Sequence, residues 1–408
     1  MKYFSHLNTA VEILSLYDGK IPFHYFIKEF LKLNKKYGSK DRKNISRLCY
    51  AGLRVGNAFG KWSPENKIRA GLFLCNNQQD NVTTELLDDY NEIIDKPLPE
   101  KWKVLSGSYH DFILHTNNAG NTSDSDMHGQ EDTPDTIFPV SLNEFSDGLD
   151  KDEFLFSFFV QPDLFIRIRP GKKEDVIKKL EAYDITYEFL PPATARLPIN
   201  TKLNEIFTSD REIVIQDYSS QLTGEMFQLL PPDTRKVWDA CAASGGKSLL
   251  AWDLLQDMDL TVTDIRSSII HNLTERFQQA GISNYDSFVI DLSGNIALPF
   301  ADKQDLVIAD VPCSGSGTWS RTPEQLKFFN PSAIIHYQDL QRKILRNTVP
   351  AIKPGGYLLY ITCSVFKKEN EDNCSFLESE LKLEMVSSKL LKGYSLKADT
   401  MFAALFKR

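Results

Sequence analysis

The chain has 408 residues, enough for two or three domains with large hydrophobic cores. It is 42% hydrophobic and 25% charged, and it contains no apolar run of about 18 residues, so we expect no membrane span. The N-terminal segment Met1–His6 lacks an apolar signal-peptide core, which favours a cytoplasmic location. The net charge of −8 argues weakly against nucleic acid as a partner, but the acidity is local. Residues 1–103 hold 17 basic and 12 acidic residues, whereas residues 104–157 hold 1 and 11.

Residues 1–104 are predicted to be helical. Apolar residues recur at helical spacing on both sides of Gly38, a helix stop, and Ser39 can cap the second helix. Basic side chains lie around these faces: Lys32, Lys35, Lys36, Lys40, Arg42, Lys43, Arg47 and Arg54. A solvated face of a small bundle is the plain interpretation, and a phosphate-contacting surface is the alternative.

Residues 105–137 are polar, acidic and poor in large apolar side chains, which predicts a flexible linker. Residues 138–212 are expected to form a small α+β unit. Its predicted elements are a strand at 164–169, a helix at 171–183 and a strand at 185–190. Phe165, Arg167 and Arg169 share one face of the first strand. They could contact single-stranded RNA, and a purely packing role is an equal alternative.

From residue 213 the pattern becomes strand–helix–strand, which is typical of an α/β domain. A strand at 236–240 leads into a glycine loop, Cys241–Lys247, and then into a helix at 249–255. Such a loop leaves backbone N–H groups free for an anionic or carboxylate group. It matches neither the dinucleotide GxGxxG pattern nor the P-loop, which argues against a nicotinamide dehydrogenase.

Three successive predicted strands end in an acidic residue: Asp264, Asp291 and Asp310. Each alone is usually a turn or cap residue. As a series beside a glycine loop they favour an adenosine-type pocket, because ligands of open α/β sheets bind at the carboxyl ends of the strands. Asp264 is placed to hydrogen-bond ribose hydroxyls.

Two thiols also follow predicted strands. Cys313 lies three residues after Asp310, and Cys363 follows the strand at 357–361. If those strands are neighbours, both thiols face one cleft. A lone cysteine is usually a buried small hydrophobe, and Cys49, Cys75 and Cys374 are interpreted in that way. The six cysteines form no CxxC pair, so we expect reduced thiols and no metal site.

The glycine loop, Asp310-Val-Pro-Cys-Ser-Gly-Ser-Gly317 and Thr362-Cys-Ser364 together resemble the RsmB/Nop/Sun family of RNA cytosine-C5 methyltransferases. This resemblance covers residues 213–408. It implies a Rossmann-like class I methyltransferase domain with a parallel-rich, seven-stranded sheet. The stretches 37–42 and 48–54 are similar to the NusB-like RNA-binding domain of the RsmB branch. The unit at 138–212 is similar in position to the family's small RNA-recognition-like domain.

The resemblance implies S-adenosylmethionine as the methyl donor and RNA, with small-subunit rRNA first, as the partner. It makes Cys363 the nucleophile, Cys313 the residue that assists product release, and Asp310 a ligand of the base. Asp291 would bind the adenine amino group. The implied cofactor residues are Cys241, Ala242, Ala243, Ser244, Gly245, Gly246, Lys247, Asp264, Asp291 and Asp310. The family usually has proline at the position of Ser244.

Alternatives remain open at this point. The same chemistry could act on tRNA or on another rRNA site, and the chain could be a non-catalytic ribosome-assembly factor that binds RNA. A DNA cytosine methyltransferase would typically place its nucleophile in a Pro-Cys-Gln context, whereas here Pro312-Cys313 is followed by Ser314.

Overall fold

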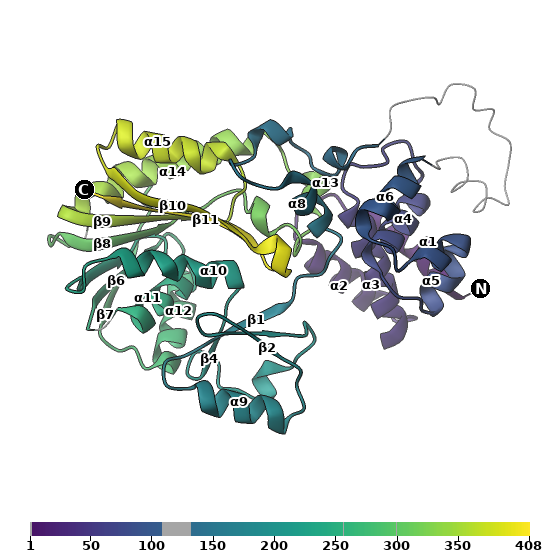
Figure 1. Ribbon diagram of the computed structural model, residues 1–408, viewed down its shortest axis with the longest axis horizontal. Helices are drawn as coiled ribbons and strands as arrows, with labels where there is room; N and C mark the ends of the chain where they lie inside the picture. The colour runs from purple at the N-terminus through teal and green to yellow at the C-terminus, as the bar shows by residue number, and fades with distance from the viewer. Residues whose placement is uncertain (1, 108–131, 256, 299) are drawn as a thin grey trace. The chain divides into compact units, whose positions relative to one another are not determined.

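The computed structural model describes residues 2–107, 132–255, 257–298 and 300–408. The chain divides into two compact units. The first is drawn from Met1–Asn143, Asp150–Gln161 and Trp319–Pro331, and the second from Glu144–Leu149, Pro162–Thr318 and Ser332–Arg408 (Figure 1). Among the described residues, no helix is both long and apolar enough to cross a bilayer.

The first unit is built from helices, as the apolar periodicity predicts. They are α1 (Lys2–Leu16), α2 (Phe23–Leu33), α3 (Ser39–Arg54), α4 (Pro64–Cys75), α5 (Asn81–Leu86), α6 (Leu98–Gly107), α8 (Lys151–Ser157) and α13 (Gln325–Phe328), with the 3₁₀ turns η1 (Asp88–Ile93) and η2 (Pro134–Ile137). On α3, Ile45, Leu48 and Cys49 have no exposed surface, so the face predicted to be apolar is the buried one.

Among the basic residues singled out in the sequence analysis, Arg54 is not on the surface of this unit. Arg54 is 5% exposed, and its guanidinium donates hydrogen bonds to the carbonyls of Phe158 and Ser320. It therefore cannot belong to a phosphate-contacting surface. Lys32, Lys35, Lys36, Lys40 and Lys43 are exposed, and for them both interpretations stand.

The predicted linker at 105–137 falls largely on 108–131, outside the described residues. Its described ends belong to regular elements instead. Helix α6 continues to Gly107, and Ile137 is fully buried in η2. The stretch 150–161, which we assigned to the small α+β unit, clusters with the helical unit because Phe154, Leu155 and Phe158 are buried there.

The second unit contains a small antiparallel sheet in the order β2-β3-β1-β4. Its strands are β1 (Leu164–Ile168), β2 (Glu188–Leu190), β3 (Thr194–Leu197) and β4 (Ile213–Ile215), and one face carries α9 (Lys173–Ala182). Ile166, Ile168, Val176 and Leu180 form the core between this sheet and α9. The sequence analysis did not identify β3 and β4, which are only four and three residues long.

The prediction of an exposed RNA-stacking face on β1 is wrong, and the packing alternative is correct. Phe165 is 2% exposed and its ring stacks on Tyr218 with centroids 5.9 Å apart. Arg167 is 5% exposed, donates to Gln216 and forms an ion pair with Asp253. Alternation along a strand shows that one face is buried, but it does not reveal that polar contacts cover the other.

The main sheet of the second unit has seven strands in the order β10-β11-β9-β8-β5-β6-β7. They are β5 (Lys236–Asp239), β6 (Asp259–Asp264), β7 (Tyr285–Val289), β8 (Gln304–Asp310), β9 (Ile352–Thr362), β10 (Glu384–Lys392) and β11 (Thr400–Lys407). Strands β5 to β9 pair in parallel, and β10 and β11 are antiparallel. This is the predicted Rossmann-like methyltransferase sheet.

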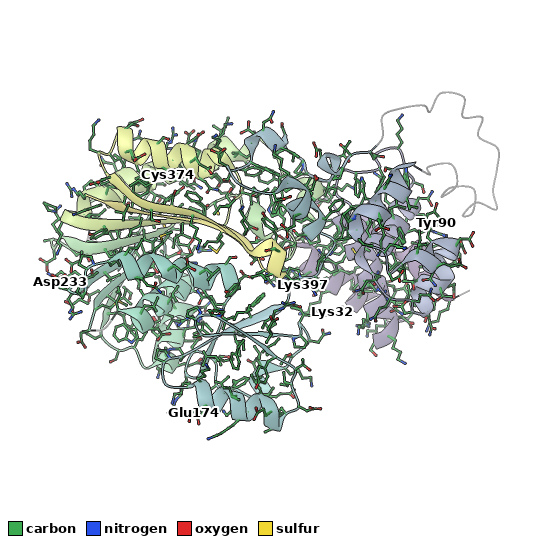
Figure 2. All side chains as sticks on the ribbon, viewed as in Figure 1. Lys32, Tyr90, Glu174, Asp233, Cys374 and Lys397 are labelled. Atoms are coloured by element: carbon green, nitrogen blue, oxygen red, sulfur yellow. The ribbon has the colours of Figure 1, made fainter. Side chains whose placement is uncertain are left out.

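Helices cover both faces of this sheet (Figure 1). They are α10 (Tyr218–Leu222), α11 (Gly246–Leu254) and α12 (Ser267–Ala280) on one face, and α14 (Ala333–Thr348) and α15 (Glu371–Ser379) on the other. Each face has its own hydrophobic core, one containing Leu249 and Phe277 and the other Leu345 and Phe376. Cys374 of α15 lies in the second core, as interpreted (Figure 2). Short 3₁₀ turns complete the unit: η4 (Leu203–Glu205), η5 (Thr223–Leu229), η6 (Ser316–Thr318), η7 (Val349–Ala351), η8 (Lys367–Glu369) and η9 (Gly393–Leu396).

Candidate active site

The two thiols singled out in the sequence meet at the carboxyl edge of the main sheet. Strands β8 and β9 are parallel neighbours, with Asp310 opposite Ile361. The loop after β8 carries Cys313, and Cys363 follows β9 directly. The two Sγ atoms lie 3.2 Å apart, both cysteines are free thiols, and both side chains are partly exposed. The condition set by the sequence, that the strands be neighbours, is met.

Gly317 allows the loop after β8 to pass close to the neighbouring strands. Its N–H donates to the carbonyl of Cys363 over 2.9 Å. A Cβ at Gly317 would lie 1.9 Å from the carbonyl oxygen of Thr400 and 3.1 Å from that of Cys363, which no side chain tolerates. The glycine therefore fixes the distance between the two thiol-bearing segments.

A buried carboxyl group that the sequence analysis missed joins the same two segments. Glu369 has no exposed surface. Its Oε2 accepts from the Ser314 N–H over 2.9 Å, and its Oε1 accepts from the Ser364 hydroxyl over 2.7 Å. These serines directly follow Cys313 and Cys363. In the sequence, Glu369 looks like an ordinary acid after two lysines, so only its burial identifies it.

The surroundings of Cys313 favour its protonated form. The hydrogen bond to Cys363 is the main cause that raises the pKa of Cys313 well above the ordinary value, and burial and the nearby Glu369 act in the same direction. Burial likewise raises the pKa of Glu369. Cys313 is therefore held as a protonated thiol beside the sulfur of Cys363.

Asp310 is the last residue of β8 and forms an ion pair with a lysine of the glycine loop. Lys247 Nζ lies 3.1 Å from Asp310 Oδ2 and donates to the Ser220 hydroxyl over 2.8 Å. The Lys247 side chain is 8% exposed, whereas Asp310 is 30% exposed. We predicted Lys247 as part of the cofactor loop; the structure places its ammonium group against the acid that precedes the thiol.

The glycine loop turns sharply between β5 and α11. Gly245 has a φ of +83°, and a Cβ there would lie 2.7 Å from the Phe277 ring of α12. Helix α11 begins at Gly246, and no side chain caps its first turn. The first N–H groups of this helix are therefore available to an anionic or carboxylate ligand.

Asp264 lies beside this loop, at the end of β6. It is 6% exposed and accepts from the Ala243 N–H over 3.0 Å and from the Arg266 guanidinium over 2.9 Å. Burial alone would raise its pKa, but the bonds from Arg266 and the backbone outweigh burial and lower it. Asp264 is thus an ionised acceptor at the loop, where the sequence placed it.

The other predicted loop and acid residues differ in their surroundings. Asp291 is exposed and accepts from the Ser293 hydroxyl over 2.6 Å, a bond that lowers its pKa. This is the geometry of a turn aspartate. Cys241 is partly buried, and burial raises its pKa, so it is an unreactive thiol.

The sequence analysis also missed Asp239, the last residue of β5. It has no exposed surface, and burial raises its pKa to about 7. Its Oδ2 accepts from the Ser248 hydroxyl over 2.6 Å, whereas its Oδ1 has no hydrogen-bond partner among the described residues. The sequence did offer a signal for this residue, because an acidic residue ends the strand that leads into the glycine loop.

The edge of the sheet therefore brings together two adjacent thiols, an acid–lysine pair and an uncapped helix start beside an ionised aspartate. A thiol pair can add to and leave an electrophilic carbon, and the acid–lysine pair can bind the polar edge of a planar base. Within the described ranges, no cluster of three or more His, Cys, Asp or Glu side chains could hold a metal ion.

The main sheet and its loops are similar to known proteins. The model of the family described as 16S rRNA methyltransferase RsmB/F matches residues 226–404. The probable ribosomal RNA small subunit methyltransferase B of Synechocystis sp. is 28% identical over 240 residues, which cover 57% of this chain and 53% of that protein. Its Bacillus subtilis counterpart is 30% identical over 168 residues, 41% of this chain and 37% of that protein. The mouse tRNA (cytosine(72)-C(5))-methyltransferase NSUN6 is 29% identical over 176 residues, 40% and 36%.

The matched part of the chain thus spans about half, or less, of the length of these relatives. Solved structures show the same fold. The crystal structure of PH0851 aligns with a TM-score of 0.67 at 19% identity, over 100% of this chain and 98% of that one. NSun6 from Pyrococcus horikoshii with SFG aligns with a TM-score of 0.54 at 14% identity, over 63% and 94%.

Proposed function

Residues 226–404 belong to the RsmB/F family of methyltransferases, and from this premise we propose that the chain methylates C5 of a cytosine in RNA, with S-adenosylmethionine as the donor. The observation that carries the proposal is the pair of thiols 3.2 Å apart at the ends of β8 and β9, beside Asp310. A site for simple methyl transfer to an amine or hydroxyl would need no such pair.

Cytosine C5 is a weak nucleophile until a thiolate adds to C6 and makes the ring enamine-like. We assign this addition to Cys363. Cys313 is held protonated, and its thiol can donate a hydrogen bond to the sulfur of Cys363, 3.2 Å away. Asp310 and Lys247, 3.1 Å apart, supply an acceptor and a donor for the polar edge of the base.

S-adenosylmethionine, when bound, supplies an electrophilic methyl group to C5. A base must then take the proton from C5. The electron pair of the C5–H bond re-forms the C5–C6 double bond, and the electron pair of the C6–S bond leaves with the Cys363 sulfur as a thiolate. We assign assistance in this release to Cys313, because a neighbouring thiol can stabilise the departing thiolate. The target base must be single-stranded or flipped out to reach this edge.

The residues at the glycine loop fit the cofactor. The uncapped start of α11 suits a carboxylate, as at the methionine end, and the buried, ionised Asp264 suits ribose hydroxyls. Cys241–Lys247 would wrap the methionine end. For Asp291 we keep the proposal that it binds the adenine amino group.

For the RNA we propose small-subunit rRNA, because the matching family and most of the relatives above carry that name. The helical unit is then proposed as a NusB-like RNA-binding domain and the small antiparallel sheet as an RNA-recognition-like domain. A tRNA target remains the alternative, since NSUN6 of mouse is named for one. The cell compartment we propose is the cytoplasm.

The decisive experiment incubates the protein with labelled S-adenosylmethionine and with rRNA, small ribosomal subunits or tRNA from a strain that lacks the gene. Mapping of 5-methylcytosine then identifies the nucleotide. We expect transfer to one cytosine of small-subunit rRNA. Transfer to tRNA alone would replace the target, and transfer to none of these would leave an RNA-binding assembly factor.

The roles of the two thiols are tested by covalent capture on RNA that contains 5-azacytosine at the mapped position. Cys363→Ala should abolish the covalent complex, because the attacking sulfur is gone. Cys313→Ala should accumulate a protein–RNA adduct on unmodified RNA, because release is slowed. The reverse pattern would exchange the two assignments, and Cys374→Ala serves as a buried-thiol control.

A further inference from the structure

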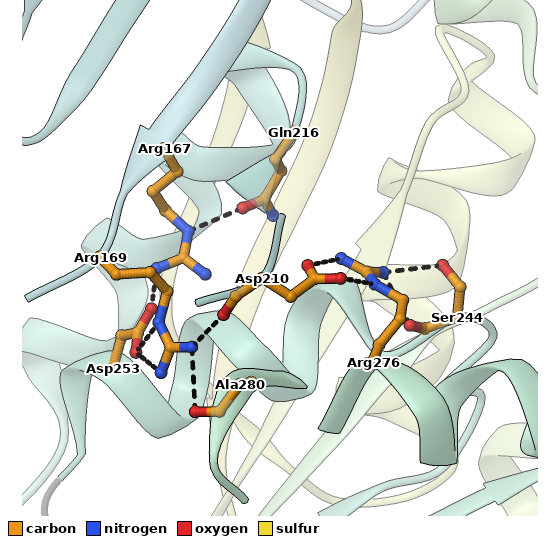
Figure 3. A network of polar contacts seen from close by, with 8 residues as sticks. All are labelled: Arg167, Arg169, Asp210, Gln216, Ser244, Asp253, Arg276 and Ala280. Atoms are coloured by element: carbon orange, nitrogen blue, oxygen red, sulfur yellow. Dashed lines mark hydrogen bonds and ion pairs between the residues drawn. The ribbon is translucent and has the colours of Figure 1, made fainter. Parts of the chain in front are cut away.

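Ser244 of the glycine loop is held by an arginine of the next helix. Arg276 of α12 donates from Nη1 to the Ser244 carbonyl over 2.7 Å and to the Ser244 hydroxyl over 3.2 Å (Figure 3). Arg276 therefore holds both the backbone and the side chain of Ser244.

The guanidinium of Arg276 is itself fixed by a buried carboxylate. Its Nε donates to Asp210 Oδ2 over 2.9 Å and its Nη2 to Oδ1 over 2.7 Å. Asp210 is 6% exposed, and its own carbonyl accepts from Arg169, the residue after β1 (Figure 3). A bidentate arginine–carboxylate pair has one strongly preferred geometry. The pair with Asp210 therefore orients the Nη1 group of Arg276 toward Ser244.

This donor completes the anchoring of three consecutive loop residues. The N–H of Ala243 donates to Asp264 over 3.0 Å, and that of Gly245 donates to the Ala242 carbonyl over 2.8 Å. The peptide group between Ser244 and Gly245 is therefore held at its oxygen by Arg276 and at its nitrogen by the loop itself. Gly245 also rests on Phe277, the residue after Arg276.

We propose that Arg276, oriented by Asp210, is a positioning residue for the cofactor loop, because its contacts with Ser244 limit the conformations that the loop can adopt. The proposal rests on the proposed function, because it takes the loop to bind S-adenosylmethionine. Proline fixes φ near −65°, whereas serine leaves the loop more conformations to lose on binding. A loop that is correctly formed only part of the time binds its ligand more weakly by that fraction.

The test measures S-adenosylmethionine affinity by calorimetry on the full chain, together with kcat and the KM for the cofactor on the mapped RNA. Arg276→Ala should weaken cofactor binding about tenfold and leave kcat within about twofold. Adding Ser244→Pro to Arg276→Ala should restore affinity to within about threefold of the wild type. A merely structural role of Arg276 would not be rescued by a ring in the loop.

Two further variants separate folding from positioning. Asp210 has a φ of +62°, a conformation that asparagine tolerates. Asp210→Asn should therefore keep the backbone conformation but weaken the ion pair that orients Arg276. It should reduce affinity in the same direction as Arg276→Ala. His271→Ala, on an exposed position of the same helix, should change nothing. Thermal unfolding of each variant shows whether it is folded.

The outcomes distinguish this proposal from the one on which it rests. A wild-type chain that does not bind S-adenosylmethionine or S-adenosylhomocysteine would overturn the proposed function. A wild-type chain that binds, with a folded Arg276→Ala variant of equal affinity, would overturn only the role of Arg276. Weak binding by Arg276→Ala that Ser244→Pro fails to restore would overturn the idea that Arg276 acts by restraining the loop.

Discussion

Replacing Glu369 tests whether one buried carboxyl group sets the relation between the two thiols. In Glu369→Ala the Ser314 N–H loses its acceptor 2.9 Å away, and the Ser364 hydroxyl loses one at 2.7 Å. The Ser364 hydroxyl can instead bond to that of Ser314 or Ser316, 3.1 and 3.3 Å away. The Gln341 side chain still donates to the carbonyl of Pro312 over 3.0 Å. The main loss therefore falls on the Ser314 N–H.

A buried donor left without an acceptor costs about 1–3 kcal/mol; the Ser314 N–H is only partly buried, so the lower end of that range applies, and the cavity left by truncation adds to the loss. Burial of the Glu369 carboxyl group is itself unfavourable, as its raised pKa indicates. Removing that group offsets part of the lost stability. We expect Glu369→Ala to lower the free energy of unfolding by about 2–4 kcal/mol. Glu369→Gln should lower the free energy of unfolding by less than about 1 kcal/mol. Its amide oxygen can still accept from the Ser314 N–H, and the Ser364 hydroxyl can rotate to accept from the amide NH₂ group.

The assay is urea unfolding, followed by the rate of covalent capture on 5-azacytosine RNA. Glu369→Ala should slow capture, because the segments that carry Cys313 and Cys363 are no longer tied together. Glu380→Ala, which removes an exposed partner of Arg346, is the matched control and should change stability by less than about 1 kcal/mol. A Glu369→Ala variant with the stability and capture rate of the wild type would refute the reasoning.

Two further predictions concern Asp239 and Gly317. Burial raises the pKa of Asp239 to about 7, so its protonated form is favoured in the folded state. Its contribution to the free energy of unfolding is therefore fully present below the ordinary pKa near 4 and is lost as the pH rises through 7. Relative to Asp239→Asn, the wild type should lose up to about 4 kcal/mol of unfolding free energy between pH 4 and pH 8, and urea titrations in which the difference stays constant would contradict this. Gly317→Ala would place a Cβ 1.9 Å from the Thr400 carbonyl and should destabilise the chain by about 3 kcal/mol or more, whereas Gly60→Ala, with open space around it, should be nearly neutral. Equal melting temperatures of these two glycine variants would show that the loop shifts freely.

The sequence alone determined the local units of the catalytic edge. Apolar runs that end in Asp264 and Asp310 predict strands with acids at their carboxyl ends, and β6 and β8 end at those residues. The glycine loop before an apolar helix was equally readable, because a turn and a helix start depend on neighbours within a few residues. The two cysteines could be placed at strand ends, but only on the condition that their strands adjoin.

Tertiary structure decided what those units meet. Glu369 reaches Ser314 from 55 positions away, and Arg167 meets Asp253 from 86 positions away, so no local pattern signals either contact. For this reason the sequence missed Glu369 and misjudged the second face of β1. Periodicity records which side of an element is apolar, whereas the partner that covers the other side depends on how distant segments pack. The 3.2 Å between Cys313 and Cys363 follows in the same way from the parallel pairing of β8 with β9.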